Sequence, residues 1–349
     1  MTFRYGLIGC GDIGKLRADG LRRSGRELRA VSDLDGARCA RVASGAVVER
    51  DWRDLIKRDD VDAVIVSTPP SLHAEMTIAA LRAGKHVICE KPLARTVKEC
   101  AAMVAAARES GRFLATGFNY RFYPSVLKAR ELLDSGLIGK VDHIRSYTGY
   151  SASVHNHAWL HDSEVMGGGS LRDNGIHLLD LTCYFLGDVA DAQGAASGLL
   201  WGFPGCEDNG CVLIRNRRGA IASAQATWSE WRGYRFQIEI TGERGTIDLS
   251  CFPMITRATW MPPGGKRQRK SWYFPMVHVM EHLKTYRWVV VESFRQEFAH
   301  FERAILGEQN SVATGADGQL TVEVAHAATN APEEVLAPGK SALGITQSR

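Results

Sequence analysis

The stretch FRYGLIGCGDIGKLRADGLRRS, residues 3–24, decides the fold. The apolar run 3–8 predicts a strand, and residues 15–24 predict a helix. Between them, Gly9, Gly11 and Gly14 have the spacing GxGxxG, which permits a tight turn, close approach of a pyrophosphate, and close packing of helix on strand. The helix N-terminus also favours negative charge. We therefore expect a dinucleotide-binding turn formed by Gly9, Gly11, Asp12, Ile13 and Gly14.

An acidic residue follows the next predicted strand, Leu28–Ser32, as a dinucleotide site requires. Asp33 lies 19 residues after Gly14, where its carboxylate accepts hydrogen bonds from ribose hydroxyls. It would repel a 2′-phosphate, so NAD is favoured over NADP. Arg38, five residues further on, weakens this preference if it faces the ribose.

Composition indicates an ordinary soluble protein. The 349 residues suggest two domains, and 45% hydrophobic with 23% charged residues is typical of globular chains. A net charge of +4 is too small to imply nucleic acid. Eight cysteines without a CxxC pair predict reduced thiols. With no signal peptide and no apolar run long enough for a membrane span, we expect a cytoplasmic protein.

Residues 1–118 alternate strand and helix, which predicts an α/β Rossmann domain with a doubly wound parallel sheet. Ligands bind beyond the carboxyl ends of the strands in such sheets. Two further segments reach that edge, one after the apolar strand 62–67 and one after the strand 86–89. The additional cofactor-binding candidates there are Ser67, Thr68, Pro69, His73, Glu90 and Lys91.

Residues 119–349 have a different pattern and predict an α+β domain with a large open, mostly antiparallel sheet. We expect strands at 141–150, 193–201, 210–215, 220–229, 234–241 and 245–249. A basic, Pro/Gly-rich loop is expected at 253–275, helices at 124–135, 170–186, 279–306 and 317–330, and an irregular tail after that.

The segment GGGSLRDNGIHLLD, residues 167–180, carries the candidate chemistry. If the helix begins at Ser170, Asp173 and His177 stand at i and i+4 on one face. A carboxylate beside an imidazole fixes its tautomer and raises its proton affinity, as a general base near neutral pH requires. An ordinary intrahelical Asp–His pair is the alternative. The triple glycine favours a ligand site, because it allows close approach.

Five motifs of the chain resemble those of the Gfo/Idh/MocA oxidoreductases and occur in that family's order. The family includes glucose–fructose oxidoreductase and inositol dehydrogenase. The motifs are GCGDIG at 9–14, STPPSLH at 67–73, EKP at 90–92, GFNYRFYP at 117–124 and GGGSLRDNGIHLLD at 167–180. The resemblance implies catalytic roles for Lys91, Asp173 and His177, and hydride transfer between nicotinamide and a sugar or cyclitol carbon bearing a hydroxyl. It also implies a homodimer or homotetramer formed through the second sheet.

In this hypothesis, His177 takes the hydroxyl proton, Asp173 orients it, and Lys91 stabilises the developing alkoxide. Lys91 is the alternative proton acceptor, if desolvation lowers its pKa. The candidate substrate contacts are Lys91, Asn119, Tyr120, Arg121, His155, His157, Trp159, Asp173 and His177.

Three other features have more than one interpretation. His155, His157 and His161 match no common zinc spacing, so we predict no metal and expect substrate contacts or a solvated loop. The basic run 266–270 is expected to be solvated, with an anionic substrate or a subunit contact as alternatives. Trp228 suggests sheet packing or an interface.

The leading hypothesis is an NAD-dependent dehydrogenase of a sugar, aminosugar, glycoside or cyclitol. Alternatives are a sugar–sugar oxidoreductase that retains NAD(P), and a non-catalytic NAD-binding regulator. The set Lys91, Asp173 and His177 weighs against the regulator, which needs no base opposite the nicotinamide. A membrane or nucleic-acid partner is not expected.

Overall fold

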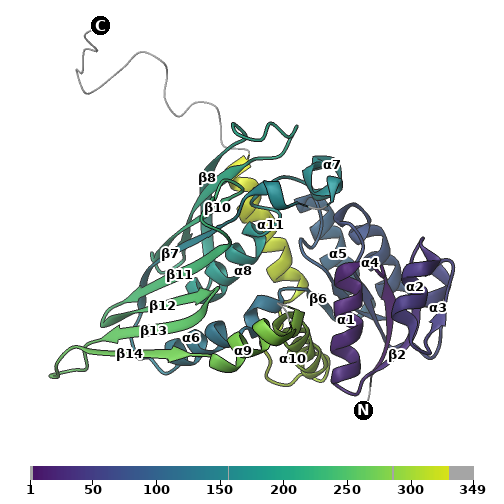
Figure 1. The fold of residues 1–349 in the computed structure, drawn as a ribbon, viewed down its shortest axis with the longest axis horizontal. Helices are drawn as coiled ribbons and strands as arrows, with labels where there is room; N and C mark the ends of the chain where they lie inside the picture. Colours follow the sequence, from purple (N-terminus) through teal and green to yellow (C-terminus); the bar gives the residue numbers. More distant parts are fainter. Residues whose placement is uncertain (1–2, 156, 285–286, 330–349) are drawn as a thin grey trace, which may run out of the picture.

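The computed structural model describes residues 3–155, 157–284 and 287–329 (Figure 1). The predicted irregular tail therefore lies outside the described residues. Two sheets stand on opposite sides of the molecule, and helices α1, α8, α10 and α11 lie between them (Figure 1).

The first sheet has six parallel strands in the order β3-β2-β1-β4-β5-β6. This confirms the doubly wound prediction. The strands are β1 Arg4–Ile8, β2 Glu27–Ser32, β3 Val47–Val48, β4 Ala63–Val66, β5 His86–Cys89 and β6 Leu114–Thr116. The helices are α1 Asp12–Arg23, α2 Gly36–Ala43, α3 Trp52–Lys57, α4 His73–Arg82 and α5 Val97–Ser110. All four residues of β4 are buried, as expected for a strand covered on both faces.

The second sheet has eight strands in the order β14-β13-β12-β11-β7-β10-β9-β8. Its pairs are antiparallel except β7 with β10, so the mostly antiparallel prediction is confirmed. The strands are β7 Val141–Gly149, β8 Val189–Ser197, β9 Asn209–Asn216, β10 Ile221–Thr227, β11 Arg235–Gly242, β12 Gly245–Cys251, β13 Met254–Trp260 and β14 Gln268–Tyr273.

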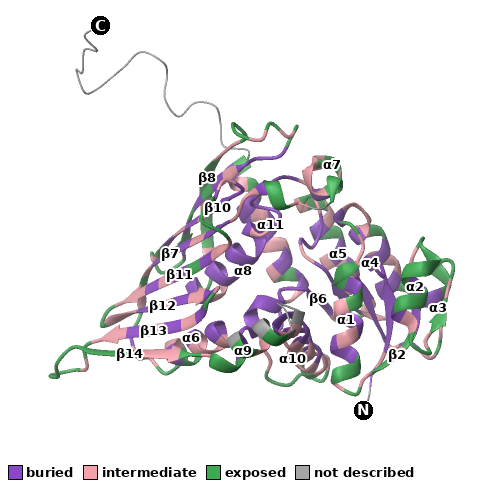
Figure 2. Ribbon diagram, in the orientation of Figure 1, coloured by how far each residue is buried: buried purple, intermediate pink, exposed green. Residues whose placement is uncertain are grey.

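Three helices pack on one face of this sheet: α6 Pro124–Asp134, α8 Gly175–Leu186 and α11 Gly315–Thr329. Every residue of α8 except Tyr184 is buried, and α8 is correspondingly purple in Figure 2. The helix that carries His177 is thus fixed within the core rather than on a mobile surface.

Three sequence predictions are corrected here. The expected loop 253–275 is largely the hairpin β13–β14, in which Met254, Thr256 and Ala258 alternate inward. The expected long helix 279–306 is replaced by α9 Pro275–Lys284 and α10 Arg287–Ile305, and the residues between them lie outside the described part. The helix expected from Ser170 begins at Gly175.

Helix α10 joins the two halves of the chain by packing on α1. Its buried Phe294 and Phe298 belong to the same apolar cluster as Tyr5 and Leu7 of β1. The predicted domain boundary at residue 118 stays a prediction, but the core of the first sheet includes side chains from beyond it. Within the described residues, no helix is long and apolar enough to cross a membrane.

Candidate functional site

The glycine turn after β1 has the three predicted features. Gly9 has φ +93°, and a Cβ there would meet the Ser67 carbonyl oxygen at 2.5 Å. A Cβ on Gly14 would lie 2.0 Å from the Gly9 carbonyl oxygen, whereas a Cβ on Gly11 would meet nothing within 4 Å. The turn therefore excludes a side chain at Gly9, and the helix packing excludes one at Gly14. Gly11 faces free space, where a ligand can approach the backbone.

Helix α1 begins directly at this turn, with Asp12 and Ile13 in its first turn. Gly11 is its N-cap and provides no side-chain hydrogen bond, so the first N–H groups are not satisfied by a capping side chain. Such an N-terminus favours a phosphate. Beside it, the Oγ of Ser67 is buried and has no hydrogen-bond partner in the described chain.

Asp33 is held at the end of β2 by two backbone groups. Its Oδ2 accepts from the Cys10 N–H at 2.7 Å and its Oδ1 accepts from the Asp35 N–H at 2.8 Å. Arg38 pairs with Asp35, with Nε and Oδ2 3.3 Å apart. The arginine therefore does not neutralise Asp33, and these residues fit the ribose hydroxyls and diphosphate of NAD.

His73 has a structural role instead of the predicted cofactor contact. Its ring is fully buried, and its nitrogens contact the carbonyl oxygens of Thr68 at 2.8 Å and Pro92 at 2.9 Å. It joins the loop after β4 to the loop after β5. Thr68 and the exposed Pro69 line the edge, and the Thr68 hydroxyl contacts the Met76 sulfur at 3.7 Å.

Glu90 belongs to a buried ionic cluster, and its contact with the cofactor stays a prediction. Its Oε1 accepts from Arg17 Nε at 2.6 Å, and Arg17 Nη1 donates to Glu297 of α10. The guanidinium carbon of Arg17 lies 3.9 Å from the ring centroid of Phe294. Burial raises the pKa of Glu297 to about 7, although Arg17 opposes the shift. The bond to Arg17 holds the Glu90 side chain in place. It thereby fixes the backbone of Glu90, to which Lys91 is joined.

Lys91 brings the first sheet into contact with the second domain. Its Nζ donates to the Asp173 carbonyl oxygen at 3.2 Å and lies 3.6 Å from Asp173 Oδ1. The Lys91 side chain is 22% exposed, so the ammonium still reaches solvent or a ligand. Two predicted catalytic residues, distant in sequence, thus meet at one edge.

Asp173 precedes α8 rather than belonging to it. The turn before it is pinned by Glu207, whose carboxylate accepts from the N–H groups of Gly169 at 2.7 Å and Leu171 at 2.8 Å. Asp173 Oδ2 accepts from the Tyr150 hydroxyl and from Trp228 Nε1, the latter at 3.3 Å. The prediction of an intrahelical Asp173–His177 pair is therefore wrong.

His177 is a buried neutral imidazole. Its ring stacks on Tyr120 with centroids 4.1 Å apart and an interplanar angle of 11°. Its Nδ1 has no hydrogen-bond partner within the described chain. Burial first, and then the positive charges of Lys91 and Arg17, hold the pKa of His177 well below its ordinary value. The expected increase in proton affinity is thus reversed, because burial and, after it, the nearby cations both disfavour the imidazolium.

The three substrate contacts predicted from GFNYRFYP are Asn119, Tyr120 and Arg121, and each contacts another side chain of the protein. Tyr120 backs His177, and its hydroxyl lies 3.1 Å from that of Tyr234. Asn119 Nδ2 donates to Ser293 Oγ at 2.8 Å.

Arg121 makes a buried ion pair with Asp180, 2.6 Å between Nη2 and Oδ1, and lies over the Tyr184 ring. In the structure Asn119 and Arg121 are both bonded to other side chains, and their contact with a substrate stays a prediction.

The histidines of the 151–166 loop have different neighbours. His155 contacts the Tyr150 hydroxyl through Nε2 at 2.6 Å and His161 through Nδ1. The exposed His157 reaches back to the first domain, with Nε2 3.6 Å from Asp12 Oδ2. Trp159 is 37% exposed beside it. In the described residues no three His, Cys, Asp or Glu side chains are grouped to hold a metal.

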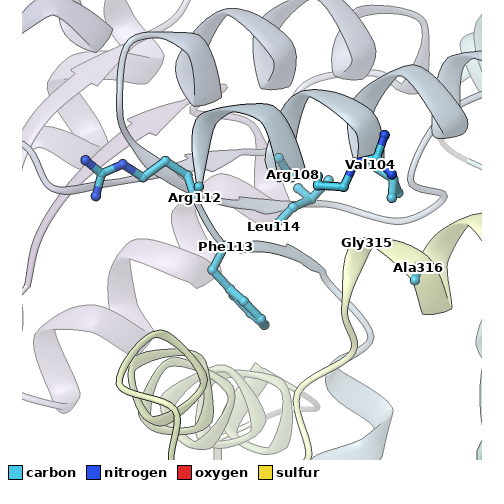
Figure 3. A pocket seen from close by; sticks show the side chains of 9 residues that line it. Val104, Arg108, Arg112, Phe113, Leu114, Gly315 and Ala316 are labelled. Carbon is cyan, nitrogen blue, oxygen red and sulfur yellow. The ribbon is translucent and has the colours of Figure 1, made fainter.

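Two cavities lie away from this edge. The one in Figure 3, of about 350 Å³, lies between α5, the start of β6 and the start of α11, beside Phe113 and Leu114. It is at the amino end of β6, opposite the ligand-binding edge. The other, of about 480 Å³, is lined by Arg121, Asp180 and Asp317 among others. Neither contains Lys91, Asp173 or His177.

Sequence reasoning missed the role of Tyr150 and misjudged that of Trp228, which both hydrogen-bond Asp173. It also missed Arg17 and Glu297. No local pattern marks these residues, because each acts through a partner more than 20 positions away. A charged residue in the buried stripe of α1, at Arg17, was the one available signal.

Comparisons with known proteins match both halves. The model described as "Oxidoreductase family, NAD-binding Rossmann fold" matches residues 3–118, and the GFO/IDH/MocA C-terminal domain model matches 126–248. Inositol 2-dehydrogenase 2 of Saccharopolyspora erythraea is 34% identical over 71% of this chain and 74% of its own. Myo-inositol 2-dehydrogenase of Thermotoga maritima is 28% identical over 95% and 96%. A levoglucosan dehydrogenase solved with NADH has a TM-score of 0.80 at 25% identity, over 94% and 96% of the two chains.

Proposed function

The chain belongs to the GFO/IDH/MocA family of NAD-binding oxidoreductases, and we propose that it oxidises a secondary hydroxyl of a sugar or cyclitol to a ketone. One observation carries the proposal: Lys91, at the nucleotide edge, contacts Asp173 of the second domain beside His177. A regulator that only binds NAD has no use for a lysine, a carboxylate and an imidazole at this position. Relatives named for inositol and levoglucosan support the polyol class.

The cofactor would be held by the first domain. Gly11 and the N-terminus of α1 would receive the diphosphate, and Asp33 would receive the ribose hydroxyls. Bound NAD⁺ supplies the hydride acceptor. The protein's own task is then to hold the substrate carbon in position and to remove the hydroxyl proton.

We assign proton removal to Lys91 acting with Asp173. As the substrate hydroxyl gives its proton to Nζ, Nζ passes one to the Asp173 carboxylate, so Lys91 stays an ammonium and Asp173 becomes a neutral carboxylic acid. His177 is a poor final acceptor, because an imidazolium there would be buried beside Lys91 and Arg17. Its neutral ring instead accepts a hydrogen bond from the substrate and orients it.

His157 and Trp159 form the outer lip of this site in our proposal. Both are exposed, and His157 approaches Asp12 at the start of α1. The Trp159 indole would pack on the apolar face of a sugar, while His157 would hydrogen-bond the sugar's hydroxyls. The loop therefore contributes to the choice of substrate.

The test is a screen for NADH formation with NAD⁺ and a panel containing myo-inositol, other inositols, levoglucosan, aminosugars and common sugars. At least one polyol is expected to be oxidised, and Lys91→Met should abolish most of that turnover. The nucleotide dissociation constant, measured by calorimetry, should remain within about threefold. A protein that binds NAD⁺ but oxidises no member of the panel would contradict the proposal.

We also propose self-association through the uncovered face of the second sheet. Leu213 of β9 and Ile221 of β10 are 51% and 55% exposed there. Apolar side chains on a broad strand surface favour a second copy of the chain. Light scattering should detect a dimer or tetramer that Leu213→Asp weakens; a monomer at all concentrations would contradict this.

A further inference from the structure

A hydrogen-bonded line of side chains leads into the 151–166 loop, and the reaction described above uses only its first member. It begins at Asp173 and continues through Tyr150 and His155 to His161. We propose that this line is a proton relay that carries the substrate's proton from Lys91 and Asp173 to solvent. The proposal rests on the proposed dehydrogenase function and deepens it.

The links from Asp173 outward are hydrogen bonds, and Lys91 joins them through its ion pair with Asp173. Lys91 Nζ lies 3.6 Å from Asp173 Oδ1, and the other carboxylate oxygen accepts from the Tyr150 hydroxyl. The same hydroxyl lies 2.6 Å from His155 Nε2. The opposite ring nitrogen of His155, Nδ1, contacts Nε2 of His161. A proton can thus enter one side of the imidazole while another leaves from the far side.

The line passes from the interior to the surface. Asp173 is 7% exposed and the His155 side chain is 3% exposed, whereas His161 is half-buried. Trp228 covers the His155 ring edge-on, with centroids 5.0 Å apart. His161 stacks on Phe203 at 3.8 Å. These aromatic rings keep water away from the inner links. The proton therefore leaves through the line of side chains and not through water in the site.

The protonation states suit a relay. Burial, followed by the Asp173 charge, raises the pKa of Tyr150 well above its ordinary value, so the hydroxyl keeps its proton. Burial lowers the pKa of His155, opposed by Asp173 and aided by His161. A neutral imidazole carries one N–H and one lone pair, which is what transfer through the ring requires.

The protons balance at every step. Protonated Asp173 gives its proton to the Tyr150 oxygen, and Tyr150 gives its own to His155 Nε2. His155 then releases its Nδ1 proton to His161 Nε2, and His161 releases one to water. Asp173 is again a carboxylate and Tyr150 again donates to it, as in the structure. Both rings now carry their proton on Nε2, so His155 and His161 must each turn over, or exchange that proton, before the next cycle.

His161 separates this relay from a purely structural network. Tyr150 and Trp228 hydrogen-bond the Asp173 carboxylate directly, and no hydrogen bond joins His161 to Asp173 in the described chain. Removing the His161 imidazole should therefore leave Asp173 in place while closing the exit. His143, an imidazole paired with Asp142 at the start of β7, is the matched control.

The experiment follows NADH absorbance and an indicator dye together in a stopped-flow instrument, with NAD⁺ and myo-inositol or the best polyol of the panel. In His161→Gln, proton release should lag behind wild type by roughly 10- to 100-fold in weak buffer, and added imidazole should restore it. The first turnover of NADH and the substrate KM should change little. His143→Gln should match wild type.

A second readout needs no turnover. In the NAD⁺-bound protein, nitrogen NMR should show that Tyr150→Phe changes the tautomer of His155 and the titration of His161, and that His143→Gln changes neither. Wild-type proton release in an active His161→Gln enzyme would overturn the relay. An unaltered His161 titration in Tyr150→Phe would also overturn it. A wild-type enzyme inactive on the whole panel would instead contradict the proposed function.

Discussion

The nucleotide edge and the wall of proposed catalytic residues opposite it are built in different ways. At the edge, six consecutive residues from Gly9 to Gly14 form the turn, and Asp33 is fixed by their backbone. At the wall, Asp173 is held by Tyr150 after β7, by Trp228 after β10, and by a turn that Glu207 pins. The glycine turn comes from one stretch of sequence, whereas the groups that hold Asp173 come from three separate stretches.

Because the two regions are built differently, we expect substitutions in them to impair different properties of the protein. Changes at the edge should weaken nucleotide binding or the fold of the first domain, whereas changes at the wall should slow the reaction while the nucleotide still binds. Lys91 belongs to both regions, because it lies in the loop after β5 and contacts Asp173.

The largest expected effect is on turnover at the contact between the two regions. Lys91→Met should lower kcat by about 10²–10⁴-fold, because the substrate's proton loses its acceptor. His177→Ala should lower it less, since we give the imidazole an orienting role. Steady-state kinetics on the best substrate measures both. A larger loss in His177→Ala would return the role of base to the histidine.

Arg17→Leu should cause the largest loss of stability. It leaves the carboxylates of Glu90 and Glu297 buried without their cation, which typically costs about 3–5 kcal/mol. Arg22→Leu, in an exposed pair with Asp19 on the same helix, is the control and should change little. Urea unfolding measures the free energy of unfolding of both variants. An Arg17→Leu loss no larger than the Arg22→Leu loss would contradict a stabilising role for the buried cluster.

Sequence patterns predicted the edge well and the wall in part. The glycine spacing and the alternation of strand and helix are local signals, so the first sheet and its ligand edge were predictable. The sequence picked out Lys91, Asp173 and His177, which the structure places near one another, but not their arrangement. The helix begins at Gly175 because Glu207, far along the chain, binds the N–H groups of Gly169 and Leu171. The hairpin β13–β14 was missed because its prolines, glycines and charges outweighed the inward alternation from Met254.

Two glycines of the turn should respond differently to alanine. Gly14→Ala places a Cβ against the Gly9 carbonyl and should cost roughly 1–3 kcal/mol of folding stability. Gly11→Ala points into open space, so stability should hold while NAD⁺ affinity falls. Thermal unfolding and calorimetric titration separate the two. Equal destabilisation of both variants would contradict the assigned geometry.

The smallest expected effect is the pH dependence contributed by Glu297. Its ordinary pKa of 4.5 is raised to about 7 by burial, so between those pH values the folded protein holds a proton that the unfolded chain has lost. The free energy of unfolding should therefore fall as pH rises through this window, by on the order of 1–3 kcal/mol. Glu297→Gln should remove that slope. Glu292→Gln, from an ion pair with Arg295 on the same helix, should keep it.

A crystal structure of the protein with NAD⁺ and its best polyol tests the meeting of the two regions most directly. We expect the nicotinamide and the oxidised carbon between Lys91 Nζ and the His177 ring, with the diphosphate over Gly11. A nicotinamide directed away from Lys91, or a polyol bound in the cavity beside Arg121 and Asp180, would contradict it.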